Sequence, residues 1–265
     1  MNKINLIPSK RLGQNFLVNK NALRTIIEAA DIKPDEVVLE IGPGTGILTL
    51  ELAKKAKRVI AVEKDAKMCE ILEKTLKEYP NVQIINDDIR FLEIGPPNIR
   101  RSDLSKYKIV ANIPYYLTSP IIRKFLEAAN PPKEMILMVQ KEVAQRICAK
   151  PPKMSILAVS VQFYAEAKIV DYVSRKSFWP SPKVDSAIIK IIPIKKTRPG
   201  LDQFFKVVKA GFSHPRKQLI NNLSTGLSLP RPQAQIWLQE NKIQPSQRAE
   251  TLTVADWIKL VKSML

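Results

Sequence analysis

The sequence predicts an α/β fold, with a mostly parallel sheet covered by helices on both faces and a smaller all-helical domain after it. Short β-branched apolar runs alternate with helical stretches from Glu36 onward, and the first of these runs ends in a cluster of glycines. Strands and helices that alternate with short links are typical of a parallel sheet. No strand pattern remains beyond Pro199-Gly200, so we expect two domains, residues 1–198 and 199–265.

The first 35 residues form a basic lead-in with a helical pattern through Leu23, Ile26 and Ile27. The apolar runs that follow are short and rich in Val and Ile, as buried parallel strands are. We expect strands at residues 37–41, 59–62, 82–86, 109–111 and 134–140, with helices at 47–55 and 66–78. Residues 154–163 fit a helix or a strand. Residues 167–173 and 187–194 are expected to form an antiparallel pair at the end of the sheet, and 201–212, 216–223, 232–239 and 254–264 to be helices.

Composition excludes several classes of protein. The chain has 265 residues, of which 45% are hydrophobic and 26% charged, values that are ordinary for a soluble globular protein. No apolar run approaches the ~20 residues that span a bilayer, and the N-terminus does not resemble a secretory signal. Two cysteines and one histidine are too few for a disulfide framework or a His-rich metal site. We therefore expect a cytoplasmic protein without a bound metal. Because no extended apolar surface is evident in the sequence, we also expect a monomer.

The unusual property is charge. The chain has 43 Lys and Arg against 25 Asp and Glu, a net charge of +18. Such an excess attracts polyanions, so nucleic acid is the first candidate partner and an anionic membrane the second. From Lys195 onward there are 12 basic and 4 acidic residues, so the C-terminal part is the more densely basic one.

Three of the eight glycines, Gly42, Gly44 and Gly46, follow the first predicted strand and precede a helix. Such a turn lets a ligand approach backbone N–H groups at a helix N-terminus. The GxGxG spacing differs from the GxGxxG of dinucleotide sites and lacks the Lys-Ser/Thr of a P-loop. Glu63, at the end of the next strand, suits the hydroxyls of a ribose. These features favour an adenosine ligand that is not a dinucleotide, and S-adenosylmethionine fits; a purely structural turn is the alternative.

Two further strands end in residues that suit adenine chemistry. The carboxylate of Asp88 is a candidate acceptor for the exocyclic amine of an adenine, or an N-cap of a helix. The next strand ends in Asn112-Ile-Pro-Tyr-Tyr116. The lone pair of an adenine amine is delocalised into the ring, so that the amine is a poor nucleophile. The Asn112 side-chain oxygen and a backbone carbonyl that Pro114 holds inward can accept its two N–H groups and free that lone pair to attack a methylsulfonium.

Aromatic side chains are expected on either side of a target base. Tyr115 can stack on one face of the base. Phe178, in Phe178-Trp-Pro-Ser-Pro182, can close the other face of a flipped base, or act as a hydrophobic plug under a loop.

Five basic residues are candidate phosphate contacts, although a solvated surface position is the alternative for each: Lys141, Arg146, Arg216, Lys217 and Arg231.

These residues together resemble the KsgA/Dim-type rRNA adenine dimethyltransferases, over nearly the whole chain. The glycine motif alone would indicate only a methyltransferase, whereas the NIPYY loop with the two segments that follow it is much more specific. The matching segments are LGQNFL (12–17), EIGPGTGILT (40–49), VEKD (62–65), NDD (86–88), NIPYYLTSPII (112–122), MVQKEVAQR (138–146), FWPSPKVDSAI (178–188), PRKQLINNL (215–223) and RAETLTVADWIKL (248–260).

The resemblance implies a Rossmann-like class I methyltransferase fold that uses S-adenosylmethionine. It implies dimethylation of two adjacent adenosines near the 3′ end of small-subunit rRNA during ribosome maturation, on an immature 30S particle. The same resemblance implies a basic, rRNA-binding C-terminal domain. The implied cofactor contacts are Asn15 and Leu17 at the methionine end, the turn of Gly42, Gly44 and Gly46, Glu63 at the ribose, Asp88 at the adenine amine, and Asn112. The implied target contacts are Asn112, Pro114, Tyr115 and Phe178.

Two segments depart from the family pattern. Residues 151–155 lack a Gly-rich, Tyr-containing lead-in, and residues 213–217 are less basic than the family usually has there. Three alternatives share much of the pattern: an Erm-type enzyme that methylates large-subunit rRNA, a non-catalytic nucleic-acid-binding relative, and, on the NIPY residues alone, a DNA adenine methyltransferase.

Overall fold

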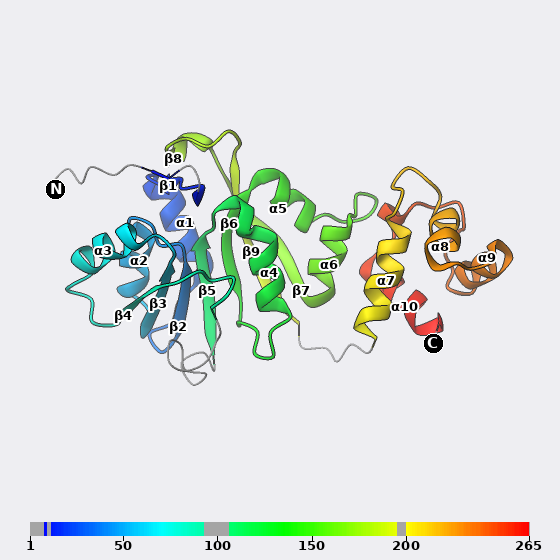
Figure 1. Cartoon of the computed structure of the whole chain (residues 1–265), viewed down its shortest axis with the longest axis horizontal. Helices are drawn as coiled ribbons and strands as arrows, with labels where there is room; N and C mark the ends of the chain where they lie inside the picture. Colours follow the sequence, from blue (N-terminus) through cyan, green and yellow to red (C-terminus); the bar gives the residue numbers. More distant parts are fainter. Residues whose placement is uncertain (1–7, 10–11, 93–105, 195–199, 265) are drawn as a thin grey trace. The chain divides into compact units, whose positions relative to one another are not determined.

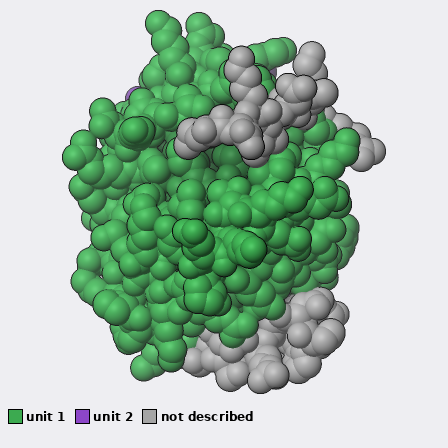
Figure 2. Space-filling model, turned by 90° about the vertical axis from the view of Figure 1, so that its left-hand side faces the viewer, with its two compact units in different colours: residues 1–144, 167–193 green, residues 145–166, 194–265 purple. Residues whose placement is uncertain are grey.

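A computed structural model describes residues 8–9, 12–92, 106–194 and 200–264 of the chain. Its contacts divide the chain into two compact units, coloured separately in Figure 2. Unit 1 comprises residues 1–144 and 167–193, and unit 2 comprises residues 145–166 and 194–265. The chain therefore leaves unit 1, contributes to unit 2, and returns before it ends in unit 2. This division differs from a single boundary near residue 198, because residues 145–166 belong with the C-terminal helices.

Unit 1 contains a seven-stranded sheet with the order β4-β3-β2-β5-β6-β9-β7 (Figure 1). The pairs β2–β3, β3–β4, β2–β5 and β5–β6 are parallel, and β9 runs antiparallel to β6. The predicted mixed α/β fold is confirmed, and the two last strands lie side by side at the end of the sheet. The strands are β2 (Val37–Ile41), β3 (Arg58–Glu63), β4 (Val82–Asn86), β5 (Tyr107–Asn112), β6 (Met135–Gln140), β7 (Ala165–Val173) and β9 (Ser186–Pro193).

A separate two-stranded ladder pairs β1 (Phe16–Leu17) with β8 (Phe178–Trp179). The two strands are antiparallel, with Phe16 opposite Trp179 and Leu17 opposite Phe178. The ladder joins the N-terminal lead-in to a segment that follows most of the large sheet in the sequence.

Helices cover both faces of the large sheet. Alternate strand residues point to opposite faces, and Val38, Val59 and Val110 pack in one cluster with residues of α1 and α2, including Ile26 and Leu52. On the opposite face, Tyr107 of β5 meets Phe125 of α4 edge to face, with ring centroids 6.5 Å apart. The helices of this part of the chain are α1 (Lys20–Ala30), α2 (Ile47–Ala53), α3 (Ala66–Thr75), η2 (Tyr115–Leu117), α4 (Thr118–Leu126), α5 (Lys141–Ile147) and η3 (Arg175–Ser177).

A buried ion network lies at the amino ends of the parallel strands. The ammonium of Lys108, near the start of β5, lies 2.9 Å from a Glu36 carboxylate oxygen and 3.0 Å from one of Glu134. Lys133 pairs with the other oxygen of Glu36, and Lys190 with the other oxygen of Glu134. Although burial raises the pKa of a carboxyl group, the hydrogen bonds from Lys133, Lys108 and a backbone N–H lower the pKa of Glu36 to about 2.

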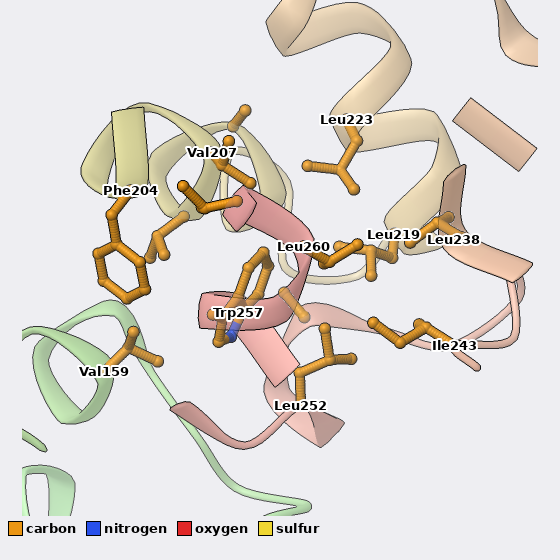
Figure 3. Packing of buried hydrophobic residues seen from close by; sticks show 14 of the residues in the cluster. Val159, Phe204, Val207, Leu219, Leu223, Leu238, Ile243, Leu252, Trp257 and Leu260 are labelled. Carbon is orange, nitrogen blue, oxygen red and sulfur yellow. The ribbon is translucent and has the colours of Figure 1, made fainter. Parts of the chain in front are cut away.

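Unit 2 is helical and encloses a hydrophobic cluster around Trp257, which is fully buried (Figure 3). Phe163 of α6 and Phe204 of α7 stack in this cluster with ring centroids 4.0 Å apart. The stretch 154–163, which fitted a helix or a strand, is helical, and α8 begins three residues later than the predicted start at Arg216. The elements are α6 (Ile156–Tyr164), α7 (Leu201–Gly211), α8 (Leu219–Leu227), α9 (Arg231–Glu240), η4 (Ala249–Thr251) and α10 (Val254–Met264).

No helix among residues 8–9, 12–92, 106–194 and 200–264 is long and apolar enough to cross a membrane.

Candidate functional site

A pocket opens at the carboxyl ends of β2, β3 and β5, the edge at which ligands bind in open α/β sheets. Its empty volume is about 1000 Å³, open solvent included. The lining comes from the N-terminal segment, the glycine turn, the end of β3, the turn after β4 and the loop after β5. Of the predicted site residues, it includes Asn15, Leu17, Gly42, Gly44, Glu63, Asp88, Asn112, Pro114 and Tyr115.

The glycine turn adopts a backbone that side chains disfavour. Gly42, Gly44 and Gly46 have φ of 67°, 56° and 81°, in the left-handed region. A Cβ on Gly44 would lie 3.1 Å from the ring of Phe16, and a Cβ on Gly46 would lie 2.8 Å from Leu72. The lack of a side chain at these glycines therefore allows the left-handed backbone of the turn, and at Gly44 it also allows the N-terminal segment to approach closely. Gly46 caps α2 and is not among the lining residues.

Glu63, the last residue of β3, is buried and holds the turn in place. One carboxylate oxygen accepts the N–H of Gly44 at 3.1 Å, and the other accepts the N–H of Asp65 at 2.9 Å. Burial raises the pKa of Glu63, and the backbone hydrogen bonds oppose this shift. The carboxylate thus sits at the pocket wall with backbone donors as its partners.

Glu40, the fourth residue of β2, also lines the pocket and is almost completely buried. Its Oε2 has no hydrogen-bond partner among the residues that the structure describes. Burial and, less strongly, the nearby Glu63 carboxylate raise the pKa of Glu40 to about 8. A buried carboxyl oxygen without a partner is costly unless a ligand supplies one. The pocket therefore contains a carboxyl group that is neutral at pH 7 and has one oxygen without a hydrogen-bond partner among the described residues.

Asp88 is held by two cations. The guanidinium of Arg90 donates to both carboxylate oxygens, with its shortest contact at 2.6 Å, and the ammonium of Lys64 lies 3.0 Å from Oδ2. The side-chain hydrogen bond from Arg90 holds the pKa of Asp88 far below its usual range. The carboxylate is therefore ionised and oriented, as an acceptor of an N–H group must be.

The N-terminal segment reaches the end of β5. The side-chain Nδ2 of Asn112 donates to the backbone carbonyl of Asn15 at 3.1 Å, and the Nδ2 of Asn15 donates to the carbonyl of Gly13 at 3.0 Å. The first bond fixes the Asn112 amide, so that its oxygen is the atom left to accept a hydrogen bond from a ligand.

The loop after β5 is also ordered by hydrogen bonds. The Pro114 carbonyl accepts the N–H of Leu117 at 2.8 Å, and one of its two lone pairs stays available. The hydroxyl of Tyr115 lies 2.8 Å from the hydroxyl of Ser186, and burial raises its pKa. The Tyr115 side chain is thus anchored at its tip, and Tyr115 is among the residues that line the pocket.

Phe178 lies elsewhere in this structure. Its side chain is buried in the hydrophobic cluster that includes Leu17 and Leu23, and it is not among the residues that line the pocket. The aromatic side chain that the same strand exposes is that of the next residue, Trp179. The structure therefore brings together three of the four predicted target contacts.

The five predicted phosphate contacts, Lys141, Arg146, Arg216, Lys217 and Arg231, are all exposed. Two of them have partners in the structure. The ammonium of Lys141 lies 5.3 Å from the centre of the Tyr172 ring, and Arg231 donates to the side-chain oxygen of Asn221. Arg216 and Lys217 lie in the connection between α7 and α8.

Sequence reasoning missed several residues that line the pocket or hold its lining residues. Phe16 covers Gly44, Gln14 donates to Asp65 at 2.9 Å, and Arg90 holds Asp88. Glu40 was available as a signal, because an acidic residue two positions before the glycine turn has to lie at the same sheet edge. The described residues contain no cluster of three or more His, Cys, Asp or Glu side chains suited to a metal ion.

The comparisons with known proteins agree with one another. A family model described as ribosomal RNA adenine dimethylase matches residues 7–265. The chain is 46% identical over 254 residues to a ribosomal RNA small subunit methyltransferase A of Dehalococcoides mccartyi, covering 95% of this chain and 86% of the relative. It is 40% identical over 264 residues to a protein of the same name from Geobacillus kaustophilus, covering 96% and 90%.

Two solved structures share most of the fold. A dimethyladenosine transferase from Plasmodium falciparum aligns with a TM-score of 0.77 and 30% identity, covering 94% of this chain and 97% of that one. The 23S rRNA methyltransferase ErmE aligns with a TM-score of 0.76 and 28% identity, covering 94% and 98%.

Proposed function

The chain belongs to the ribosomal RNA adenine dimethylase family, and we propose that it transfers methyl groups from S-adenosylmethionine to two adjacent adenosines of small-subunit rRNA. The enzyme is an rRNA adenine dimethyltransferase. The observation that carries the finer proposal is the pocket in which the glycine turn, Glu63, Asp88 and Asn112 meet. We further propose that the substrate is an immature 30S particle, and that the enzyme acts in the cytoplasm as a monomer.

The pocket residues fit S-adenosylmethionine, because their free polar groups are largely acceptors. Glu63 suits the ribose hydroxyls and Asp88 the adenine amine, while the turn of Gly42, Gly44 and Gly46 leaves room for the backbone to approach the ligand. The unpartnered oxygen of Glu40 and the side-chain oxygen of Asn112 complete the set of polar atoms that we propose the ligand contacts. Asn15 and Leu17 lie on the side where we place the methionine end. When bound, the cofactor supplies an electrophilic methyl group on a sulfonium.

The loop after β5 is proposed to activate the target amine. The Asn112 oxygen and the Pro114 carbonyl accept its two N–H groups, so that the nitrogen lone pair leaves conjugation with the ring. Both acceptors are held before the substrate arrives, by Asn15 and by Leu117. Preorganised acceptors of this kind stabilise a transition state without reorganisation. No strong general base is needed, because the amine loses its proton after the new N–C bond has made it acidic.

Aromatic contacts are proposed to hold the target base. Tyr115 is fixed by its bond to Ser186 and offers its ring within the pocket. For Phe178 to close the other face of the base, its ring has to leave the hydrophobic cluster in which the structure places it. Substrate binding would then include a change in the conformation of the Phe178 side chain.

The basic surface is proposed to bind rRNA phosphates through Lys141, Arg146, Arg216, Lys217 and Arg231. Phosphate contacts release counterions, so we expect methyl transfer at subsaturating RNA to fall steeply as salt increases. Replacing Arg216 and Lys217 with alanine should reduce the slope of log affinity against log salt by about one for each phosphate that the variant no longer binds.

The test is to offer the purified protein two substrates with labelled methyl donor: small-subunit particles from cells that lack this enzyme, and large-subunit rRNA. We expect label in small-subunit RNA, as dimethyladenosine at two adjacent positions. The similarity to ErmE favours one competing activity, methylation of 23S rRNA. Label in large-subunit RNA alone would establish that activity instead, and cofactor binding without transfer to either substrate would favour a non-catalytic nucleic-acid-binding protein.

A further inference from the structure

Trp179 exposes half of its surface, although tryptophan is a side chain that proteins usually bury. It lies on β8, opposite Phe16 of β1, and the two rings stack with centroids 6.4 Å apart and planes 23° apart. Phe16 in turn covers Gly44 and lines the pocket. One ring therefore separates Trp179 from the cofactor turn, and its outer face is open to solvent.

The segment that carries Trp179 is held firmly on both sides. Before it, the Ser177 carbonyl accepts the N–H of Val18 at 2.9 Å. After it, the hydroxyl of Ser181 donates to the carbonyl of Arg175 at 2.9 Å, and Asp185 accepts the N–H of Arg175 at 3.0 Å. An aromatic surface that is fixed in advance loses little conformational entropy when a ligand stacks on it.

The segment that carries Trp179 is basic. Residues 174–184 include Arg175, Lys176 and Lys183, all exposed, and no acidic residue, while the following Asp185 accepts the backbone N–H of Arg175. A positively charged surface with a protruding aromatic ring is the arrangement that binds single-stranded nucleic acid, in which phosphates meet the cations and a base stacks on the ring.

We infer that Trp179 is a stacking platform for a base of the substrate RNA other than the adenine that is methylated. This inference rests on the proposed function for the identity of the RNA. The ladder of β1 and β8 then connects RNA binding with the cofactor site. The Trp179 ring, which receives the flanking base, packs on the Phe16 ring, which covers the glycine turn. Trp179 is a binding residue, and its loss affects the hold on RNA and not the methyl-transfer step.

Intrinsic fluorescence tests the contact directly. The chain has three tryptophans, and the other two, Trp237 and Trp257, are buried in unit 2. Titrating the full-length protein with oligoadenylate should quench the emission of Trp179, whereas inorganic polyphosphate, which has the charge without the bases, should compete for binding and leave the emission unchanged. Equal emission with and without saturating oligoadenylate would overturn the inference.

Variants at this position separate stacking from charge. Trp179→Leu keeps an apolar side chain and removes the aromatic face, and it should weaken oligoadenylate binding roughly tenfold, while Trp179→Phe keeps most of the affinity. The salt dependence should be unchanged in Trp179→Leu and reduced when Lys176 and Lys183 are both replaced with alanine. Wild-type affinity of Trp179→Leu for oligoadenylate would contradict the inference.

Methyl transfer to small-subunit particles supplies the second measurement. For Trp179→Leu we expect a KM for particles roughly tenfold higher, an unchanged kcat and an unchanged affinity for S-adenosylmethionine. A matching loss of cofactor affinity would show that Trp179 only supports Phe16, and would overturn the inference. If the wild type instead methylates large-subunit RNA alone, the proposed substrate is wrong, and the oligoadenylate measurements still decide the role of Trp179.

Discussion

Buried acidic side chains have different partners at the two ends of the sheet in unit 1. At the amino end, Glu36 and Glu134 each have two lysine partners, and both carboxylates are neutralised within the protein. At the carboxyl end, among the residues that the structure describes, the partners of Glu63 are backbone N–H groups, and Glu40 has a carboxyl oxygen with no partner. Both ends are buried, so burial alone does not explain the difference. The lysine partners at the amino end stabilise the fold, whereas the carboxyl end has a buried polar oxygen without a protein partner, at a cost in stability that we propose a ligand offsets.

The largest effect is expected at the carboxyl end. Asn112→Ala removes the proposed acceptor of the target amine, and loss of one preorganised group in a transition state lowers kcat by roughly 10²–10³-fold. Single-turnover transfer of labelled methyl groups to small-subunit particles measures this loss. Particle binding and the unfolding midpoint should stay close to wild type. A variant that transfers methyl groups normally would remove Asn112 from the mechanism.

The reverse pattern is expected at the amino end. Lys108→Met leaves Glu36 and Glu134 with one lysine each in a buried site, and we expect unfolding to become easier by about 3 kcal/mol, measured by urea denaturation. Lys133→Met is the matched control, because Lys133 pairs with the same Glu36 and is 43% exposed, so that its loss should cost less than ~1 kcal/mol. The affinity of folded Lys108→Met for cofactor should be unchanged. If Lys108→Met lost methyl-transfer activity without a decrease in its free energy of unfolding, the proposed difference between the two ends of the sheet would be wrong.

Glu36 and Glu40, one just before β2 and one within it, are expected to give the stability of the protein opposite dependences on pH. The pKa of Glu36 is lowered from 4.5 to about 2, so its contribution is present above pH 4.5 and is lost as the pH falls toward 2. The pKa of Glu40 is raised from 4.5 to about 8. Its contribution to the free energy of unfolding is therefore fully present below pH 4.5 and is lost as the pH rises toward 8.

We therefore expect opposite behaviour from the two glutamine variants. The destabilisation in Glu36→Gln should shrink as the pH falls from 5 to about 2. The free energy of unfolding of Glu40→Gln, relative to that of the wild type, should increase as the pH rises from about 5 to 8. Urea unfolding at a series of pH values measures both differences. Parallel curves for Glu40→Gln and the wild type over that range would show that Glu40 ionises normally.

The smallest effect is expected for the cation that orients Asp88. Arg90→Leu removes a partly exposed ion pair, and such pairs contribute modestly, so we expect cofactor affinity to fall about two- to fivefold with kcat unchanged. Arg123→Ala is the control, since Arg123 pairs with Glu127 on an exposed face of α4. Equilibrium binding of S-adenosylmethionine distinguishes the two. Equal affinities for both variants would mean that Lys64 alone orients Asp88.

The parts that the sequence predicted are those governed by local pattern. Val37–Ile41 and Arg58–Glu63 are strands whose β-branched runs are followed by recognisable turns, and their last residues meet at one sheet edge because parallel strands point the same way. That rule brings Glu63 and Asn112 to the pocket. The helix α6 was ambiguous because it is apolar on most sides, as a segment packed against other helices is.

The parts that escaped prediction depend on contacts between distant segments. No local pattern shows that residues 145–166 pack with the C-terminal helices, or that Phe178 enters a cluster with Leu17. The start of α8 shifted because Lys217 donates its N–H to the His214 carbonyl in a turn before the helix begins. The pairing of Arg90 with Asp88 likewise depends on the conformations of the two side chains, which their spacing in the sequence does not determine.

The interleaving of the two units sets an order for folding during synthesis. Every strand that the structure describes in unit 1 has been synthesised once Pro193 has left the ribosomal exit tunnel. Unit 2 cannot bury Phe163 until Phe204 and Trp257 have emerged. Domains generally fold as units while the chain grows. The nascent chain therefore carries an apolar α6 helix without its partners until translation has passed Trp257, and a chaperone that binds short apolar helices would find its site there.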